Sequence, residues 1–321
     1  MIRNYLKVRS YRLLILISII LLSGFALYLN TYYKSLFNTL DPKPGNETIS
    51  FYKIEEDLKD KTNYFTWLGQ STILLSIDNK NVLFDPIFSM RASPFSFVGP
   101  KRSIPLIIKV SDLPRIDYVF ISHNHYDHLD MSTLKTLQKH NPDIIFNVPL
   151  GDKKLLTSNS LNNVKEFSWW ESNESKDLSI TFIPAKHWSA RGFFDRNKSL
   201  WGGWVTRFNE MSFLHLGDTA YDKNFLDYKE RIGKIDIGFI PIGSYYPAEI
   251  ESDIHANPEE GVQISLDLNI KSSYGIHWGN IYFSQEPTYE PRDIIKSISL
   301  KNKRVNFHTP LPGEIINLNL D

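Results

Sequence analysis

Residues 122–128 carry the sequence Ser122-His123-Asn124-His125-Tyr126-Asp127-His128, directly after the apolar segment Tyr118–Ser122. Neutral imidazole and carboxylate are the ligands that zinc-like divalent ions take when no thiolate is present. His123 and His125 are two residues apart, so in an extended chain both point to one side and could bind one ion. Asp127 and His128 are adjacent, point in different directions and could reach a second ion. The alternative, a polar surface loop, does not explain the apolar segment that would place these side chains at a sheet edge.

The composition narrows the classes of site that the chain could hold. It has 321 residues, with 36 Lys plus Arg balanced by 36 Asp plus Glu, so the formal net charge is zero. A general nucleic-acid binder needs a basic surface, and we therefore expect no nucleic-acid partner. There is no cysteine, which excludes disulfides, thiolate zinc sites and cysteine nucleophiles. Any metal must be held by His, Asp and Glu, and the chain has nine histidines.

Three further candidate ligands follow apolar, strand-like segments in the same way. His187 follows the segment 180–184, Asp218 follows 213–217, and His277 follows 274–276. Singly, either histidine would more often be a core residue, and Asp218 could simply close a turn. Together with residues 123–128, they form the set of side chains that a site at one edge of a sheet requires. Asp218 is suited to bridge two ions because a carboxylate has two oxygens.

The first 34 residues predict a membrane anchor. The segment Leu13–Leu29 has no charged residue, and four basic residues precede it, namely Arg3, Lys7, Arg9 and Arg12. The positive-inside rule then predicts a single-pass helix with a cytoplasmic N-terminus and the rest of the chain on the extracytoplasmic side. A cleaved signal peptide and a buried core helix are the alternatives. We expect residues 35–60 to be a linker and residues 61–321 to be the folded domain that carries the candidate site.

The remaining sequence predicts an α/β fold. Ten short apolar segments read as strands, the first three with a hairpin at 78–80. Helices are predicted over 131–140 and over 258–268, where Asn257 is the cap and Pro258 takes the first helical position. Early strands followed by strands mixed with helices indicate two sheets packed between helices.

The ordered set of motifs resembles the metallo-β-lactamase superfamily. The residues that carry this resemblance are His123-x-His125-x-Asp127-His128, followed by His187, Asp218 and His277. The resemblance implies a four-layer αββα sandwich over 61–315, with a metal site at one sheet edge. Within the superfamily the chain resembles the N-acyl-phosphatidylethanolamine-hydrolysing phospholipases D, through segments that include Trp67-Leu68-Gly69, Asp85-Pro86-Ile87-Phe88-Ser89, Gly99-Pro100-Lys101-Arg102, Gly217-Asp218-Thr219 and Ile276-His277-Trp278-Gly279.

That resemblance implies a ligand set and a reaction. One zinc ion would be bound by His123, His125 and His187, and the other by Asp127, His128 and His277, with Asp218 shared between them. The implied reaction is phosphodiester hydrolysis that releases N-acylethanolamine and phosphatidic acid. Asp127 and Asp218 would take part in catalysis by orienting the attacking water. His255 matches a family histidine near the substrate and could protonate the leaving group or bind the head group. The chain departs from the family at Gln70, where the family commonly has histidine.

Aromatic and basic residues suggest how a membrane phospholipid would be bound. Phe88 and Phe193 could contact acyl chains, as could their neighbours Phe95, Phe97 and Phe194, and Arg91 could meet a phosphate. Ordinary core packing and solvated surface charge are the alternatives.

Other functions remain open at this point. A hydrolase of the same fold could act on a lactone, a thioester or a soluble phosphodiester, and a non-catalytic metal-binding module is a third hypothesis. Histidine and aspartate also suit manganese or iron, so the sequence does not fix the metal.

Overall fold

The computed structural model describes residues 16–20, 22–24, 48–54, 58–176, 178–209, 211–281 and 283–318. The chain divides into two compact units, residues 1–44 and residues 45–321. Within the predicted linker, Ile49 and Leu58 are buried. The predicted domain boundaries otherwise stay predictions.

The predicted membrane anchor lies largely outside the described residues. Of residues 1–34 the structure describes only 16–20 and 22–24, which are helical and exposed. No helix in the described part of the chain is long and apolar enough to cross a membrane. The prediction of a single-pass anchor with an extracytoplasmic catalytic domain is therefore corrected.

Within the described ranges, the strands form two sheets of seven strands each. The first sheet has the order β14 (Ile315–Asn317), β1 (Tyr64–Trp67), β2 (Ile73–Ile77), β3 (Lys80–Phe84), β4 (Tyr118–Phe120), β5 (Ile145–Pro149) and β6 (Val164–Phe167). The second has the order β13 (Phe307–His308), β12 (Ile270–Ile276), β11 (Ile235–Pro241), β10 (Met211–His215), β9 (Gly202–Phe208), β8 (Ser179–Pro184) and β7 (Ser172–Glu174).

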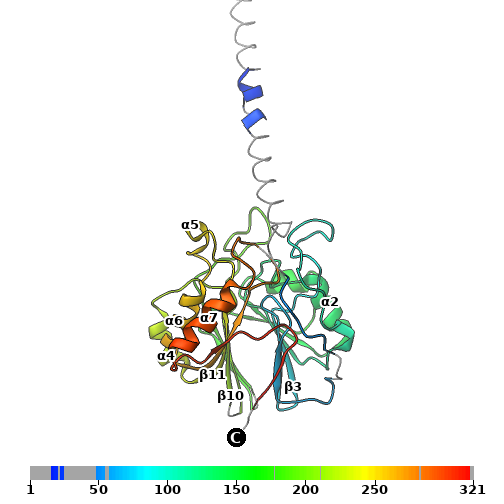
Figure 1. Ribbon diagram of the computed structural model, residues 1–321. Coiled ribbons are helices and arrows are strands. Elements are labelled where there is room, and N and C mark those ends of the chain that lie inside the picture. The colour runs from blue at the N-terminus through cyan, green and yellow to red at the C-terminus, as the bar shows by residue number, and fades with distance from the viewer. Residues whose placement is uncertain are drawn as a thin grey trace, which may run out of the picture. The chain divides into compact units, whose positions relative to one another are not determined.

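Helices cover the outer faces of both sheets. Their bounds are α2 (Met131–His140), α3 (Lys153–Thr157), α4 (Phe225–Ile232), α5 (Ala248–Glu251), α6 (Pro258–Asp267) and α7 (Glu290–Lys301), with a 3-10 turn at Val110–Asp112. Figure 1 shows α4, α6 and α7 along the sheet that contains β10 and β11, and α2 on the side of β3. This arrangement confirms the expected αββα sandwich.

Local sequence explains why these elements form where they do. The predicted hairpin joins β2 to β3 through Asp78 and Asn79, whose φ angles of 50° and 60° suit a tight two-residue turn. Asp130 caps α2 by accepting hydrogen bonds from the backbone of its first turn. Asn257 and Glu260 form a reciprocal capping box at the start of α6. The parallel strand β11 is buried along its whole length, as expected for a strand covered on both faces.

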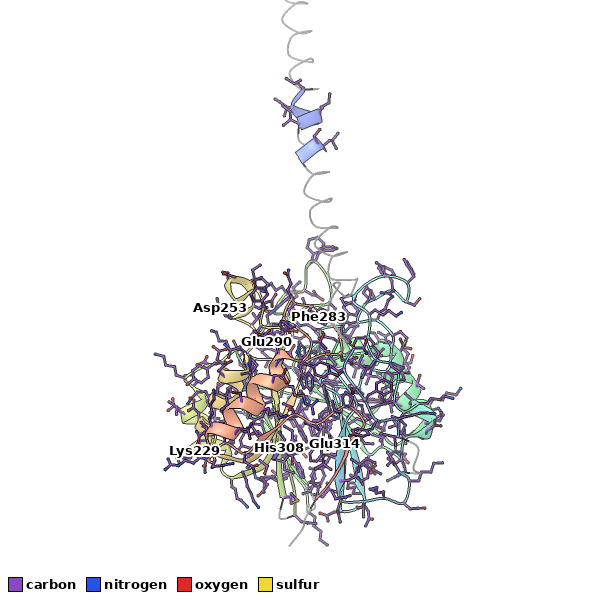
Figure 2. The ribbon with its side chains drawn as sticks, in the orientation of Figure 1. Lys229, Asp253, Phe283, Glu290, His308 and Glu314 are labelled. Carbon is purple, nitrogen blue, oxygen red and sulfur yellow. The ribbon has the colours of Figure 1, made fainter. Side chains whose placement is uncertain are left out.

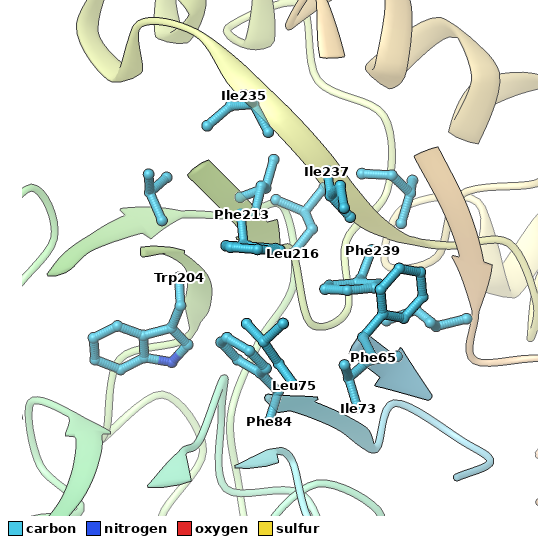
Figure 3. Packing of buried hydrophobic residues seen from close by; sticks show 14 of the residues in the cluster. Phe65, Ile73, Leu75, Phe84, Trp204, Phe213, Leu216, Ile235, Ile237 and Phe239 are labelled. Atoms are coloured by element: carbon cyan, nitrogen blue, oxygen red, sulfur yellow. The ribbon is translucent and has the colours of Figure 1, made fainter. Parts of the chain in front are cut away.

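The core lies between the two sheets. In Figure 3, Phe65, Leu75 and Phe84 of the first sheet face Trp204, Phe239 and their neighbours of the second. Phe65 meets Phe239 edge-on with ring centroids 5.1 Å apart. A hydrogen bond of 2.8 Å from the Trp204 indole Nε1 to the carbonyl of Ile121 also links the sheets. These contacts therefore fix the position of one sheet against the other, and with it the relative positions of the strand ends at their common edge.

Candidate metal centre

The candidate ligands come from the ends of four strands. Residues 123–128 follow β4, His187 follows β8, Asp218 follows β10, and His277 comes directly after β12. Gly217 has φ +63°, and a Cβ there would lie 2.4 Å from the Cβ of Ser122. Glycine therefore permits the close approach that brings Asp218 against the loop after β4. Figure 2 shows Asp253, which follows α5, and Phe283, which follows β12, both toward the upper end of the domain in this view.

The first ligand group consists of His123, His125 and His187. Nδ1 of His125 lies 2.8 Å from Nε2 of His123 and 3.3 Å from Nε2 of His187. The other ring nitrogen of His187, Nδ1, lies 2.8 Å from the carbonyl of Ile254. Because a carbonyl only accepts hydrogen bonds, Nδ1 must carry the proton and Nε2 keeps its lone pair. The three histidines thus each bring one ring nitrogen to the same point.

The second group consists of Asp127, His128, Asp218 and His277. Oδ2 of Asp127 lies 3.3 Å from Nε2 of His128 and 3.2 Å from Nε2 of His277. Oδ2 of Asp218 lies 3.0 Å and 3.2 Å from the same two nitrogens. Ligands bound at about 2.0–2.1 Å in a tetrahedron are about 3.3 Å apart. These separations therefore fit a single small cation.

Asp218 lies between the two groups. Its Oδ2 is also 3.9 Å from Nε2 of His123 and 3.8 Å from Nε2 of His187. Its Oδ1 is buried without a hydrogen-bond partner among the described residues. The same carboxylate oxygen therefore faces both groups, and the sharing of Asp218 between two ions stays a prediction.

The protonation of the histidines also fits a cation. Burial lowers the pKa of His125 to about 3 and the pKa of His187 to about 4. Both rings are therefore neutral, which is the ligand form. Burial opposes protonation of His128 and His277 as well, but the nearby carboxylates, led by Asp218, raise the pKa of His128 well above its usual range and that of His277 to about 9. The buried carboxylates are thus stabilised by nearby positive charge. A divalent ion would supply that charge in place of these two protons.

Asp85 was missed by the sequence analysis and orients His128. Its carboxylate accepts hydrogen bonds from the backbone N–H and hydroxyl of Ser122, at 2.7 and 2.6 Å, and lies 2.8 Å from Nδ1 of His128. This holds the His128 proton on Nδ1 and leaves Nε2 for a metal. The rule that found the other ligands could have found it, because Asp85 directly follows β3 at the same sheet edge.

Arg191 was also missed and holds the loop after β4. Its Nη1 donates to the carbonyls of Asn124 and Leu129, both at 2.8 Å. Its guanidinium lies 3.9 Å over the ring of Tyr126, and the Tyr126 hydroxyl donates back to the Arg191 carbonyl. No local motif marked this residue, since its partners lie more than 60 positions away.

His255 lies beside both ligand groups. Its ring centroid is 5.1 Å from that of His187 and 5.4 Å from that of His277. Its Nδ1 is buried and has no partner among the described residues. Burial lowers the pKa of His255 well below its usual range, so the ring is neutral at pH 7 and suited to hydrogen bonding.

The structure separates the other expected substrate residues. Phe88 is buried in the core under α2, and its backbone N–H bonds to Thr133, so it serves packing. Phe193 is 90% exposed. Nη1 of Arg91 donates to the carbonyl of Gly99, which braces its own loop.

Comparisons with known proteins agree with this geometry. Residues 80–278 match the model of the beta-lactamase superfamily domain. The N-acyl-phosphatidylethanolamine-hydrolyzing phospholipase D 1 of Caenorhabditis elegans is 36% identical over 86% of this chain and 82% of its own length. The mitochondrial N-acyl-phosphatidylethanolamine-hydrolyzing phospholipase D of Saccharomyces cerevisiae is 37% identical over 74% of this chain and 52% of its own length, so the match spans about half of that relative.

Among solved structures, a possible metal-dependent hydrolase from Veillonella parvula aligns with a TM-score of 0.65 and 17% identity, over 80% of this chain and 100% of that one. This likeness concerns the fold. The motifs and the matched relatives point to the same chemistry. The chain is a metal-binding hydrolase of the metallo-β-lactamase superfamily and belongs to the family of the N-acyl-phosphatidylethanolamine-hydrolysing phospholipases D.

Proposed function

We propose that the chain is a two-zinc phosphodiesterase that hydrolyses N-acyl-phosphatidylethanolamine to N-acylethanolamine and phosphatidic acid. The observation that carries this proposal is the position of Asp218, whose Oδ2 lies within 3.9 Å of histidine nitrogens from both ligand groups. The names of the two relatives support the substrate. Divalent ions, when bound, activate water as a nucleophile and offset the charge of a phosphodiester.

The side chains of this protein would divide the remaining work. Asp127 and Asp218 are buried carboxylates that can orient the attacking water by accepting its hydrogen bonds. Water attacks phosphorus, the P–O bond to N-acylethanolamine breaks, and the departing oxygen takes up the proton that the attacking water gives up. His255 is neutral, and we therefore assign it to binding the polar head of the substrate rather than to acid catalysis.

Exposed aromatic residues beside the centre support a lipid substrate. Phe193 and Phe194 are 90% and 88% exposed, on the loop that begins with Arg191. Phe95 and Phe97 are also exposed, with ring centroids 5.6 Å apart. Both loops adjoin Tyr126 of the ligand loop. The loop of Phe193 and Phe194 does so through Arg191, whose guanidinium lies over the Tyr126 ring. The loop of Phe95 and Phe97 does so through Ala92, which forms a small core with Ile87 and Ile281 on which Tyr126 packs. Large apolar side chains left in water next to a site are typical of a surface that meets lipid.

One assay tests the proposal. The full chain, loaded with Zn²⁺, would be given N-acyl-phosphatidylethanolamine in mixed micelles, and mass spectrometry would follow both products. Asp218→Ala serves as the blank, because it removes the carboxylate that lies between the two ligand groups. We expect both products from the native chain and neither from the blank. Absence of products from a chain that carries two ions would refute the phospholipase D reading and favour a lactone, thioester or soluble phosphodiester.

A further inference from the structure

Gln70 occupies a fixed and strained position beside the second ligand group. It lies between β1 and β2, its side chain is buried, and its φ of +51° is unusual for a residue other than glycine. Its carbonyl accepts hydrogen bonds from the Trp67 indole at 2.7 Å and from the backbone N–H of His277 at 2.8 Å. Gln70 therefore already holds the backbone of one candidate ligand.

The side-chain amide of Gln70 has a defined orientation. Its Oε1 accepts a hydrogen bond from the backbone N–H of Ile281 at 3.2 Å, and a backbone N–H can only donate. The amide nitrogen must therefore face the centre. Nε2 lies 2.9 Å from Oδ2 of Asp127 and 2.8 Å from Nε2 of His277. An amide N–H donates hydrogen bonds and cannot bind a cation, so it supports Asp127, whose oxygen accepts this bond, and is not itself a ligand.

We propose that Gln70 is a positioning residue for the second cation position alone. Its amide N–H holds the oxygen of Asp127 that faces His128, and its carbonyl holds His277. It has no hydrogen bond to His123, His125 or His187 among the described contacts. The neutral amide of Gln70 takes neither a metal nor a proton, and it therefore leaves the ligand set unchanged while fixing its geometry. This inference rests on the two-ion centre of the proposed function.

Zinc titration of the full, metal-stripped chain against a chromophoric chelator tests the inference without any substrate. Gln70→Met keeps the volume of the side chain and removes its hydrogen bonds. We expect the affinity of one position to fall about 10–100-fold while the other changes less than about twofold. Cobalt substitution adds a spectroscopic check, because the visible absorption should change only for the more weakly bound ion. Gln138→Met on α2 is the matched control, since that amide bonds the Ser160 carbonyl at an exposed site.

The possible outcomes separate this inference from the proposed function. Equal weakening of both positions would overturn it, because the effect would then be on the fold as a whole. Unchanged affinity at both positions would overturn it as well. A native chain that binds a single ion would overturn both the two-ion centre and the role of Gln70. Failure to hydrolyse the phospholipid has no bearing on the titration.

Discussion

The replacement Asp85→Asn should damage the centre through the tautomer of one ligand. The Asp85 carboxylate accepts hydrogen bonds from two groups of Ser122 and lies 2.8 Å from Nδ1 of His128. Asparagine keeps one oxygen, which can still accept from the backbone of Ser122. The new NH₂ then faces the Ser122 hydroxyl and Nδ1 of His128. The hydroxyl can rotate to accept, but His128 can accept only by moving its proton to Nε2.

The magnitude follows from the bonds that are lost. Nε2 of His128 lies 3.0 Å from Oδ2 of Asp218. With the proton on Nε2, His128 no longer offers a lone pair to a cation bound there. Loss of such a supporting carboxylate lowers metal affinity about 10–100-fold, or about 1.4–2.8 kcal/mol. The two hydrogen bonds to the buried carboxylate also become hydrogen bonds from a neutral amide, which lowers the free energy of unfolding by about 2–3 kcal/mol.

Nitrogen NMR of the histidine rings and zinc titration would measure both effects. We expect the His128 proton on Nδ1 in the zinc-loaded native chain and on Nε2 in the variant. Asp130→Asn is the matched control, because Asp130 is a buried carboxylate that caps α2 and bonds no candidate ligand. It should lower stability without changing the affinity for zinc. Native zinc affinity in Asp85→Asn would refute the reasoning.

Four further replacements test other parts of the structure. His187→Ala should leave one ion per chain by elemental analysis and abolish hydrolysis, and two tightly bound ions would contradict the assignment of this ligand. Changing both Phe193 and Phe194 to Ser should lower turnover of micellar phospholipid at least about tenfold. The free energy of unfolding should stay within about 0.5 kcal/mol of the native value, because both side chains are exposed. Unchanged turnover would show that the aromatic loop does not bind substrate. Burial raises the pKa of Asp152 to about 6, so the folded chain binds this proton more tightly than the unfolded chain does. Its contribution to stability is therefore largest below about pH 4 and is lost as the pH rises through about 6. In urea unfolding, the free energy of unfolding of Asp152→Asn relative to that of the native chain should therefore rise by up to about 3 kcal/mol between pH 4 and pH 7. An equal difference between the two chains at both pH values would contradict this. Gly217→Ala should lower the free energy of unfolding by at least about 2 kcal/mol, because a Cβ there would overlap a side chain 2.4 Å away, and native stability would show that the loop can yield.

The sequence predicted the parts of the fold that depend on buried, apolar elements. The strands β2, β10 and β11 are nearly continuous runs of buried residues, and α2 was predicted with the bounds it has. The short edge strand β7 reads Ser-Asn-Glu and is exposed throughout, so nothing in its pattern differs from a loop. It pairs with β8 through its backbone, which carries no sequence signal.

The candidate ligands were predictable for a reason that fails for substrate residues. Each ligand follows a strand, and strands that share a sheet edge bring their ends together. Phe88 and Phe193 both lie in loops, where no periodicity distinguishes a core side chain from an exposed one. One proved buried and the other almost fully exposed. Gln70 could be noticed only as a departure from the family, because its contacts with Asp127 and His277 span 57 and 207 positions.

The two ligand groups have a property that only the sheet arrangement reveals. His123 and His125 follow β4 of the first sheet, whereas His187 follows β8 of the second. The second group likewise takes Asp127 and His128 from the first sheet and two ligands from the second. Each of these two groups therefore draws on both sheets, and an ion bound in either group would join the two. Because an unfolded chain lacks this arrangement, metal binding would add to the stability of the sandwich by mass action. The hydrophobic core between the sheets and the metal centre at their edge would thus both stabilise the packing of one sheet against the other.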